Sequence, residues 1–154
     1  MKLIRLIVTF LYVGNAKIAP GTIASLATVV LFYFFEMHLG VFSFILIILG
    51  TTLLAFVTVR VYTADLLEKD RSEIVIDEVI GQSISLLPLL VFKENAVTDL
   101  YLYLISLLFF RFFDIVKPYP INKFDKMNSP FGIIFDDILA GTFSAILLIA
   151  ILMV

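Results

Sequence analysis

Residues 39–59 read LGVFSFILIILGTTLLAFVTV, and none of these 21 residues carries a charge. A helix needs about 20 mostly apolar residues to cross the roughly 30 Å hydrocarbon core of a bilayer, so this stretch predicts a membrane-spanning helix. The composition agrees, because 62% of the 154 residues are hydrophobic, 16% are charged and the mean hydropathy is +1.11. Soluble domains are about 45–50% apolar and about 25% charged. The sequence therefore favours a membrane protein over a soluble or disordered chain.

Further uncharged stretches predict more spans of the same kind. We expect spanning helices at about residues 22–36, 39–59, 79–92, 100–112 and 138–154. The third and fourth are short for independent spans, so they predict a hairpin that depends on its neighbours. Residues 3–13 carry Arg5 inside an apolar pattern, which indicates an interfacial helix. The expected fold is a single all-α domain over residues 1–154, a polytopic membrane helical bundle of about four to five spanning helices plus this interfacial helix.

The charged residues predict an orientation for this bundle. Alternating loops place ten of the 11 basic residues on one side, and only Lys93 on the other. The positive-inside rule then places the N-terminus in the cytoplasm and Val154 outside. Glu36, Glu94 and Asp99 fall on the outer side, where we expect ordinary loop charges. The remaining acids lie on the cytoplasmic side, several of them at span boundaries, where carboxylates are costly unless they are paired or bind a cation.

The rare residue types narrow the chemistry. Cysteine is absent, which excludes disulfides, thiolate metal sites and cysteine nucleophiles. Histidine occurs once, at His38, so a two-histidine metal site within one chain is excluded as well. The net charge of -2 argues against a general nucleic-acid binder, because such proteins present a basic face.

The segment APGTIASL, residues 19–26, combines a chain break with the start of an apolar helix. The Pro-Gly pair predicts a helix that begins near Thr22, with Thr22 as its N-cap. The free N–H groups of such a start suit an anion. Ser25 falls on the same helical face, and Lys17 lies just upstream. The simpler alternative is a capped helix with an ordinary turn.

Two adjacent acid pairs precede apolar runs, Asp77-Glu78 and Asp136-Asp137. Carboxylate oxygens from two such pairs suit Mg²⁺, which binds one or two carboxylates together with substrate phosphate and water. The alternative is that each pair only complements the dipole at a helix N-terminus. Two pairs on one membrane face favour the metal.

The segment FRFFDIVKPYPI, residues 110–121, places Asp114 and Lys117 three residues apart. One helical turn would make them an ion pair, and Pro118 predicts that the helix ends at about Lys117. The Lys117 ammonium could hold a phosphate oxygen while Asp114 orients it or binds metal. A structural interfacial salt bridge is the alternative.

Taken in chain order, these motifs resemble the phosphatidylglycerophosphatase A family. The matching residues are Gly14, Ala19-Pro20-Gly21-Thr22, Ser25-Leu26, Ile76-Asp77-Glu78, Gly81, Phe110-Arg111-x-Phe113-Asp114-x-x-Lys117-Pro118-x-Pro120-Ile121 and Gly132-Ile133-x-x-Asp136-Asp137-x-x-Ala140-Gly141. The resemblance implies a Mg²⁺-dependent, multi-pass lipid phosphatase of the bacterial cytoplasmic (inner) membrane that converts phosphatidylglycerophosphate to phosphatidylglycerol and inorganic phosphate. Its partners would be that lipid substrate and membrane lipids, with no nucleic acid. Two departures concern backbone flexibility: Ala24 stands where the family usually has glycine, and residues 128–131 replace a glycine-rich stretch.

Elimination of other phosphatase mechanisms favours the same class. No Asp-x-Asp-x-Thr/Val segment marks an aspartyl-phosphate enzyme, so metal-assisted hydrolysis remains. We expect the active site at the cytoplasmic face. The candidate metal ligands are Asp77, Glu78, Asp136 and Asp137. The candidate phosphate-binding residues are Lys17, Thr22, Ser25, Arg111 and Lys117. The candidate catalytic residues are Asp77, Asp114, Lys117 and Asp137. A small membrane transporter and a structural subunit with acids at helix ends are the alternatives.

Overall fold

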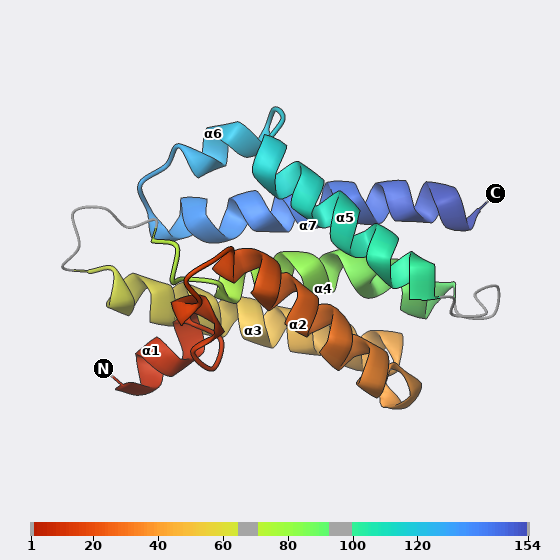
Figure 1. Cartoon of the computed structure of the whole chain (residues 1–154), viewed down its shortest axis with the longest axis horizontal. Coiled ribbons are helices and arrows are strands. Elements are labelled where there is room, and N and C mark those ends of the chain that lie inside the picture. The colour runs from red at the N-terminus through yellow and green to blue at the C-terminus, as the bar shows by residue number, and fades with distance from the viewer. Residues whose placement is uncertain (1, 65–70, 93–99, 154) are drawn as a thin grey trace.

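The computed structural model describes residues 2–64, 71–92 and 100–153. Over these residues the chain is helical and contains no strand, so the all-α prediction is confirmed (Figure 1). The longer helices are α2 (Pro20–Phe35), α3 (Val41–Tyr62), α4 (Ile76–Val91), α5 (Leu100–Val116) and α7 (Pro130–Leu152). The short elements are α1 (Lys2–Val8), η1 (Val13–Asn15), η2 (Glu36–His38) and α6 (Ile121–Asp125).

The five longer helices form one elongated bundle (Figure 1). Helices α2, α4 and α7 start at the end of the bundle that carries the N-terminus, and α3 and α5 return to that end. Helices α1 and α6 also lie there, whereas the C-terminus lies at the opposite end. We call these the N-terminal end and the C-terminal end of the bundle.

Helix α4 forms the centre of the bundle and packs against α2, α3, α5 and α7. Eleven of its 16 residues are buried. Helix α3 shows the opposite pattern, with five of 22 residues buried and large apolar side chains such as Leu49 and Leu53 exposed. An apolar outer surface of this extent is typical of a membrane-embedded helix.

Among the described residues, three helices are long and apolar enough to cross a bilayer: residues 20–38, which include η2, together with α3 and α7. Helices α4 and α5 have 16 and 17 residues. At 1.5 Å per residue they extend about 24–26 Å, which is less than the hydrocarbon thickness of about 30 Å. Their packing against longer neighbours agrees with the expectation that they depend on the rest of the bundle.

Several helix boundaries differ from the sequence prediction. Helix α2 begins at Pro20, so the prediction that Thr22 is its N-cap is wrong. Proline is favoured at the first helical position because it has no N–H to leave unpaired. Helix α7 begins at Pro130 and not near residue 138, because Ser129 caps it by accepting a hydrogen bond from Gly132 N at 3.1 Å. Asp136 and Asp137 therefore lie inside a helix and not at its start.

The predicted N-terminal helix over residues 3–13 is too long. Helix α1 ends at Val8, and Phe10, Leu11 and Tyr12 have positive φ angles of 43°, 56° and 68°. This left-handed stretch turns the chain into η1 before α2 begins.

The prediction for Glu36 as an ordinary loop charge is also wrong. Glu36 is only 6% exposed and accepts a hydrogen bond from the Tyr103 hydroxyl across the bundle. Glu94 and Asp99 lie outside the described residues. A polar contact of this kind between η2 and α5 cannot be inferred from local sequence, because its partners are 67 positions apart.

Candidate active site

Two glycines bring α4 and α7 into backbone contact. A Cβ on Gly141 would lie 2.2 Å from the carbonyl oxygen of Gly81, and a Cβ on Gly81 would lie 2.6 Å from the carbonyl oxygen of Asp137. Close approach of this kind requires residues without side chains. Asp77 precedes Gly81 by four residues and Asp137 precedes Gly141 by four, which is about one helical turn in each case. The glycine crossing therefore brings the two aspartates together.

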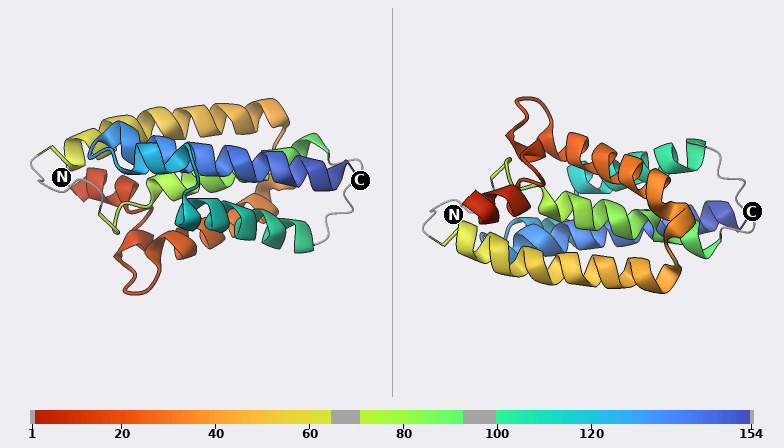
Figure 2. Two further views of the ribbon diagram at one scale, coloured as in Figure 1. Left: turned by 90° about the horizontal axis from the view of Figure 1, so that it is seen from above. Right: turned by 90° about the horizontal axis from the view of Figure 1, so that it is seen from below.

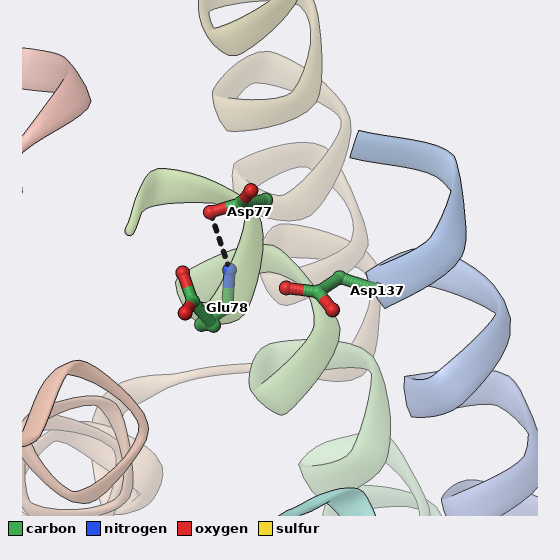
Figure 3. A group of neighbouring side chains, drawn as sticks. All are labelled: Asp77, Glu78 and Asp137. Carbon is green, nitrogen blue, oxygen red and sulfur yellow. Dashed lines mark hydrogen bonds between the residues drawn. The ribbon is translucent and has the colours of Figure 1, made fainter. Parts of the chain in front are cut away.

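Asp77, Glu78 and Asp137 form a cluster that we call the acid trio. Each offers a carboxylate oxygen, and these oxygens lie within 4.8 Å of one another. Figure 3 shows Asp137 reaching from α7 toward Asp77 and Glu78 on α4. Asp77 and Asp137 are 7% and 4% exposed. Asp77 accepts a hydrogen bond from Glu78 N at 3.1 Å, which fixes the carboxylate of Asp77 against the first turn of α4.

The acid trio is short of positive charge. Within residues 2–64, 71–92 and 100–153, neither Asp77 nor Asp137 forms an ion pair. Over the same residues, Glu78 Oε2 is buried and has no hydrogen-bond partner. Clustered buried carboxylates repel one another and lose hydration, so the arrangement is costly unless a cation binds. Three converging carboxylates are suitable oxygen donors for a hard divalent ion such as Mg²⁺.

Arg111 and the start of α2 border the acid trio on one side. A Cβ on Gly21 would lie 2.0 Å from Glu78 Oε1 and 3.2 Å from a terminal nitrogen of Arg111. The guanidinium of Arg111 also forms an ion pair of 2.7 Å with Asp114, one turn along α5. The N-terminus of α2, with its free N–H groups, therefore lies beside both an acid of the trio and a cation.

Lys117 lies at the centre of a second charge cluster, directly after α5. Its Nζ donates hydrogen bonds to Asp125 at 2.5 Å and to Asp136 at 2.7 Å, and it lies 4.0 Å from Asp114. Burial on its own lowers the pKa of Lys117, but the hydrogen bonds to Asp125 and Asp136 outweigh burial and raise that pKa above its usual range. Lys117 therefore remains an ammonium ion at any physiological pH.

The acid trio and Lys117 share one small polar cavity of about 80 Å³ at the N-terminal end of the bundle. Its acidic and basic lining residues are Arg71, Asp77, Glu78, Asp114, Lys117, Asp125, Asp136 and Asp137. A water molecule occupies about 30 Å³ in the liquid, so the cavity has room for a metal ion with a small number of waters or phosphate oxygens.

Comparison with known proteins adds the decisive observation. Residues 6–152 match the family model of phosphatidylglycerophosphatase A. The chain belongs to this family. It is 38% identical over 134 residues to phosphatidylglycerophosphatase A of Haemophilus influenzae, covering 86% of this chain and 78% of the relative. It is 31% identical over 133 residues to phosphatidylglycerophosphatase A of Escherichia coli, covering 86% and 73%.

A third relative carries a different name. A Bacteroides thetaiotaomicron protein, named provisionally as a phosphatidylinositol-3-phosphatase, is 32% identical over 144 residues, covering 88% of this chain and 84% of the relative. No solved structure matches the chain. Membership of the phosphatidylglycerophosphatase A family supports phosphatase activity on a lipid phosphate.

For this family member, the structure brings together most of the residues singled out from the sequence. Asp77, Glu78 and Asp137 form the trio, and Asp114, Lys117 and Asp136 share its cavity. Asp136 lies against Lys117 and outside the trio, so the structure separates the two members of the Asp136-Asp137 pair. Adjacent side chains on a helix point about 100° apart, and here Asp137 faces α4 whereas Asp136 faces Lys117.

The predicted phosphate-binding residues divide into two groups. Arg111 borders the acid trio, and Lys117 lines the cavity that contains the trio. Lys17 is exposed, Thr22 is half-buried, and the buried Ser25 hydroxyl donates to the carbonyl of Gly21 at 2.9 Å. The hydroxyl proton of Ser25 is therefore used in a hydrogen bond within α2. Sequence reasoning missed Asp125, whose only signal was its place among the acids of the cytoplasmic side.

Proposed function

We propose that this chain is a Mg²⁺-dependent phosphatase that hydrolyses the terminal phosphomonoester of phosphatidylglycerophosphate. The products would be phosphatidylglycerol and inorganic phosphate. The acid trio supports the proposal most directly, because three converging carboxylates lie in one cavity with a lysine, in a member of a lipid phosphatase family.

The metal would be held by Asp77, Glu78 and Asp137. Their oxygen donors and the unpartnered Glu78 Oε2 fit a Mg²⁺ ion, and a divalent charge would relieve the repulsion among the three carboxylates. When bound, Mg²⁺ would supply charge stabilisation to the phosphoryl oxygens in the transition state. Asp136 would act from outside this set by orienting Lys117.

Lys117 has the donors to bind the substrate phosphate. An ammonium group has three N–H donors, and two of them reach Asp125 and Asp136. The third is available for a phosphate oxygen. The two aspartates fix the direction of Lys117, and this preorganises its charge before the substrate arrives. Asp114 would act as a positioning residue, since it pairs with Arg111 and lies 4.0 Å from Lys117.

The site would face the cytoplasm in a bacterial cytoplasmic membrane. The acid cavity lies at the N-terminal end of the bundle, and the positive-inside rule assigns that end to the cytoplasm. A lipid phosphate lies at the bilayer surface, so a cavity at one end of the bundle suits such a substrate. A reporter fused after Val154 is expected to read outside the cytoplasm, and a cytoplasmic reading would contradict the proposed orientation.

Phosphate release from purified protein in detergent tests the activity. Phosphatidylglycerophosphate, phosphatidylinositol 3-phosphate and phosphatidic acid would be compared, each with Mg²⁺ varied from absent to millimolar. We expect Mg²⁺-dependent release from phosphatidylglycerophosphate at the highest kcat/KM. Preferred release from phosphatidylinositol 3-phosphate would reassign the substrate, and no release from any of the three would refute the phosphatase proposal.

A further inference from the structure

A second and larger cavity runs along the bundle between α2 and α3, with α4 as its floor. Its volume is about 390 Å³. The view from below in Figure 2 shows α4 lying between α2 and α3. The floor consists of Ile76, Val79 and Ser83, which share one face of α4. Thr28 on α2 and Thr51 on α3 belong to the walls. We call this cavity the α2–α3 groove.

Apart from His38, the polar residues of the α2–α3 groove present an apolar surface. The hydroxyls of Thr28, Thr51 and Ser83 donate to the carbonyls of Ala24, Ile47 and Val79 in their own helices, at 2.9, 2.8 and 2.7 Å. Because each of these hydroxyls donates to a backbone carbonyl of its own helix, mainly the carbon atoms of the side chain face the groove. The groove therefore suits a hydrocarbon ligand better than a polar one.

The groove begins beside the acid trio. Ile76 in its floor directly precedes Asp77. From there the floor runs to Ser83, and the α2 wall runs from Thr28 to Phe35. Seven residues of helix correspond to about 10 Å, a large part of the roughly 15 Å of hydrocarbon that one leaflet contributes. The groove therefore has the length to hold a segment of a chain that enters from the side of the site.

We propose that the α2–α3 groove holds one fatty acyl chain of the lipid whose phosphate occupies the acid cavity. This inference rests on the proposed function. Both flanking helices are candidate membrane spans, so lipid chains are the groove's natural neighbours. A hydrocarbon chain in the groove would gain dispersion contacts with the apolar lining. An acyl chain that moves from the surrounding lipid into the groove gains little hydrophobic free energy. The benefit of binding the chain would be that it orients the substrate phosphate at the acid trio.

A bulky side chain in the groove tests the inference. Tyr62, the last residue of α3, lies at the N-terminal end of the bundle, and Thr51 precedes it by 11 residues, so Thr51 lies about 16 Å into the bundle. A palmitoyl chain would reach Thr51→Phe, whereas a hexanoyl chain would not. Thr52→Phe is the matched control, because Thr52 has the same half-buried class and the same bond to its own helix, through Ile48 O, but lies outside the groove.

The measured quantity is chain selectivity, the kcat/KM for dipalmitoyl divided by that for dihexanoyl phosphatidylglycerophosphate. We expect Thr51→Phe to lower this ratio about tenfold, mainly through the KM of the dipalmitoyl substrate. Thr52→Phe should leave the ratio within about twofold of the unmodified protein. Equal ratios in the two variants would overturn the groove assignment. No hydrolysis by the unmodified protein would instead refute the proposed function.

Photolabelling decides the groove assignment independently of turnover. Phosphatidic acid and phosphatidylcholine, each with a diazirine in mid-chain, would label the protein in vesicles, and adducts would be mapped by mass spectrometry. We expect phosphatidic acid to label Thr51 and Ser83 several-fold more than the outward-facing Leu53, and Thr51→Phe to reduce those adducts. Even labelling of Thr51 and Leu53 would overturn the groove. Equal labelling of the groove by phosphatidylcholine would overturn its link to a lipid phosphomonoester.

Discussion

Gly81 and Gly141 are in direct backbone contact, with no room for a Cβ on either residue. This contact lies one helical turn from Asp77 on α4 and one turn from Asp137 on α7. The spacing of the acid trio is therefore set by the glycine crossing. Charged residues can converge in this bundle because two residues without side chains let the helices meet.

Gly141→Ala is expected to separate α4 from α7. The new Cβ would lie 2.2 Å from the Gly81 carbonyl oxygen, and overpacking of this kind costs about 1–3 kcal/mol. We expect a lower melting temperature in detergent and at least a tenfold loss of phosphatase activity. Gly50→Ala on α3 is the control, because a Cβ there meets no atom within 4 Å. Gly50→Ala should retain activity and melt at the same or a higher temperature. Equal behaviour of the two variants would contradict the role of the crossing.

Neutralising a member of the acid trio is expected to lower activity sharply with little change in shape. Asp77→Asn and Asp137→Asn each remove a candidate metal ligand, and a loss of several kcal/mol of transition-state stabilisation corresponds to roughly 100- to 1,000-fold in kcat. Glu73→Gln is the control, since Glu73 pairs with Arg71 at 3.2 Å and lies outside the trio. Full activity of Asp77→Asn would remove that residue from the proposed metal site.

Mg²⁺ is expected to stabilise the folded protein through the acid trio. A ligand at 100 times its dissociation constant adds about 2.7 kcal/mol of stability when it binds only the folded state. Thermal melting with and without Mg²⁺, and after chelation by EDTA, measures this effect. The Mg²⁺-dependent rise should disappear in Asp77→Asn and persist in Glu73→Gln. An identical rise in both variants would place the ion elsewhere.

Lys117 is expected to have a structural role and a substrate-binding role that can be separated. Lys117→Met would leave the buried Asp136 without its partner, which costs about 3 kcal/mol. The double variant Lys117→Met/Asp136→Asn removes both charges, so we expect it to regain most of that stability. Phosphate release should nevertheless remain low, because the phosphate-binding ammonium is gone. Recovered activity in the double variant would show that Lys117 acts only on folding.

The class of fold could be predicted from the sequence because every membrane-spanning helix must be long and apolar enough to cross the bilayer. Residues 39–59 had to be a long apolar helix, and α3 confirms it. The same reasoning singled out the acids as candidate functional residues, since carboxylates in a membrane bundle are costly unless they are paired or bind a cation. Helix starts were harder to predict, because Thr22 and Pro20 offer competing local signals, and Pro20 prevailed at α2.

The sequence by itself determined that this protein is an all-helical membrane bundle with two acid pairs and a lysine as its candidate chemistry. Only the tertiary structure decided which of those acids lie together. The contact between Gly81 and Gly141 brings Asp137 close to Asp77 and Glu78, while Asp136 on the same helix lies against Lys117. The buried contact between Glu36 and Tyr103 likewise depends on packing. Bilayer thickness and the free-energy cost of buried charge constrain each helix separately. Which side chains converge depends instead on how closely two helices can approach each other.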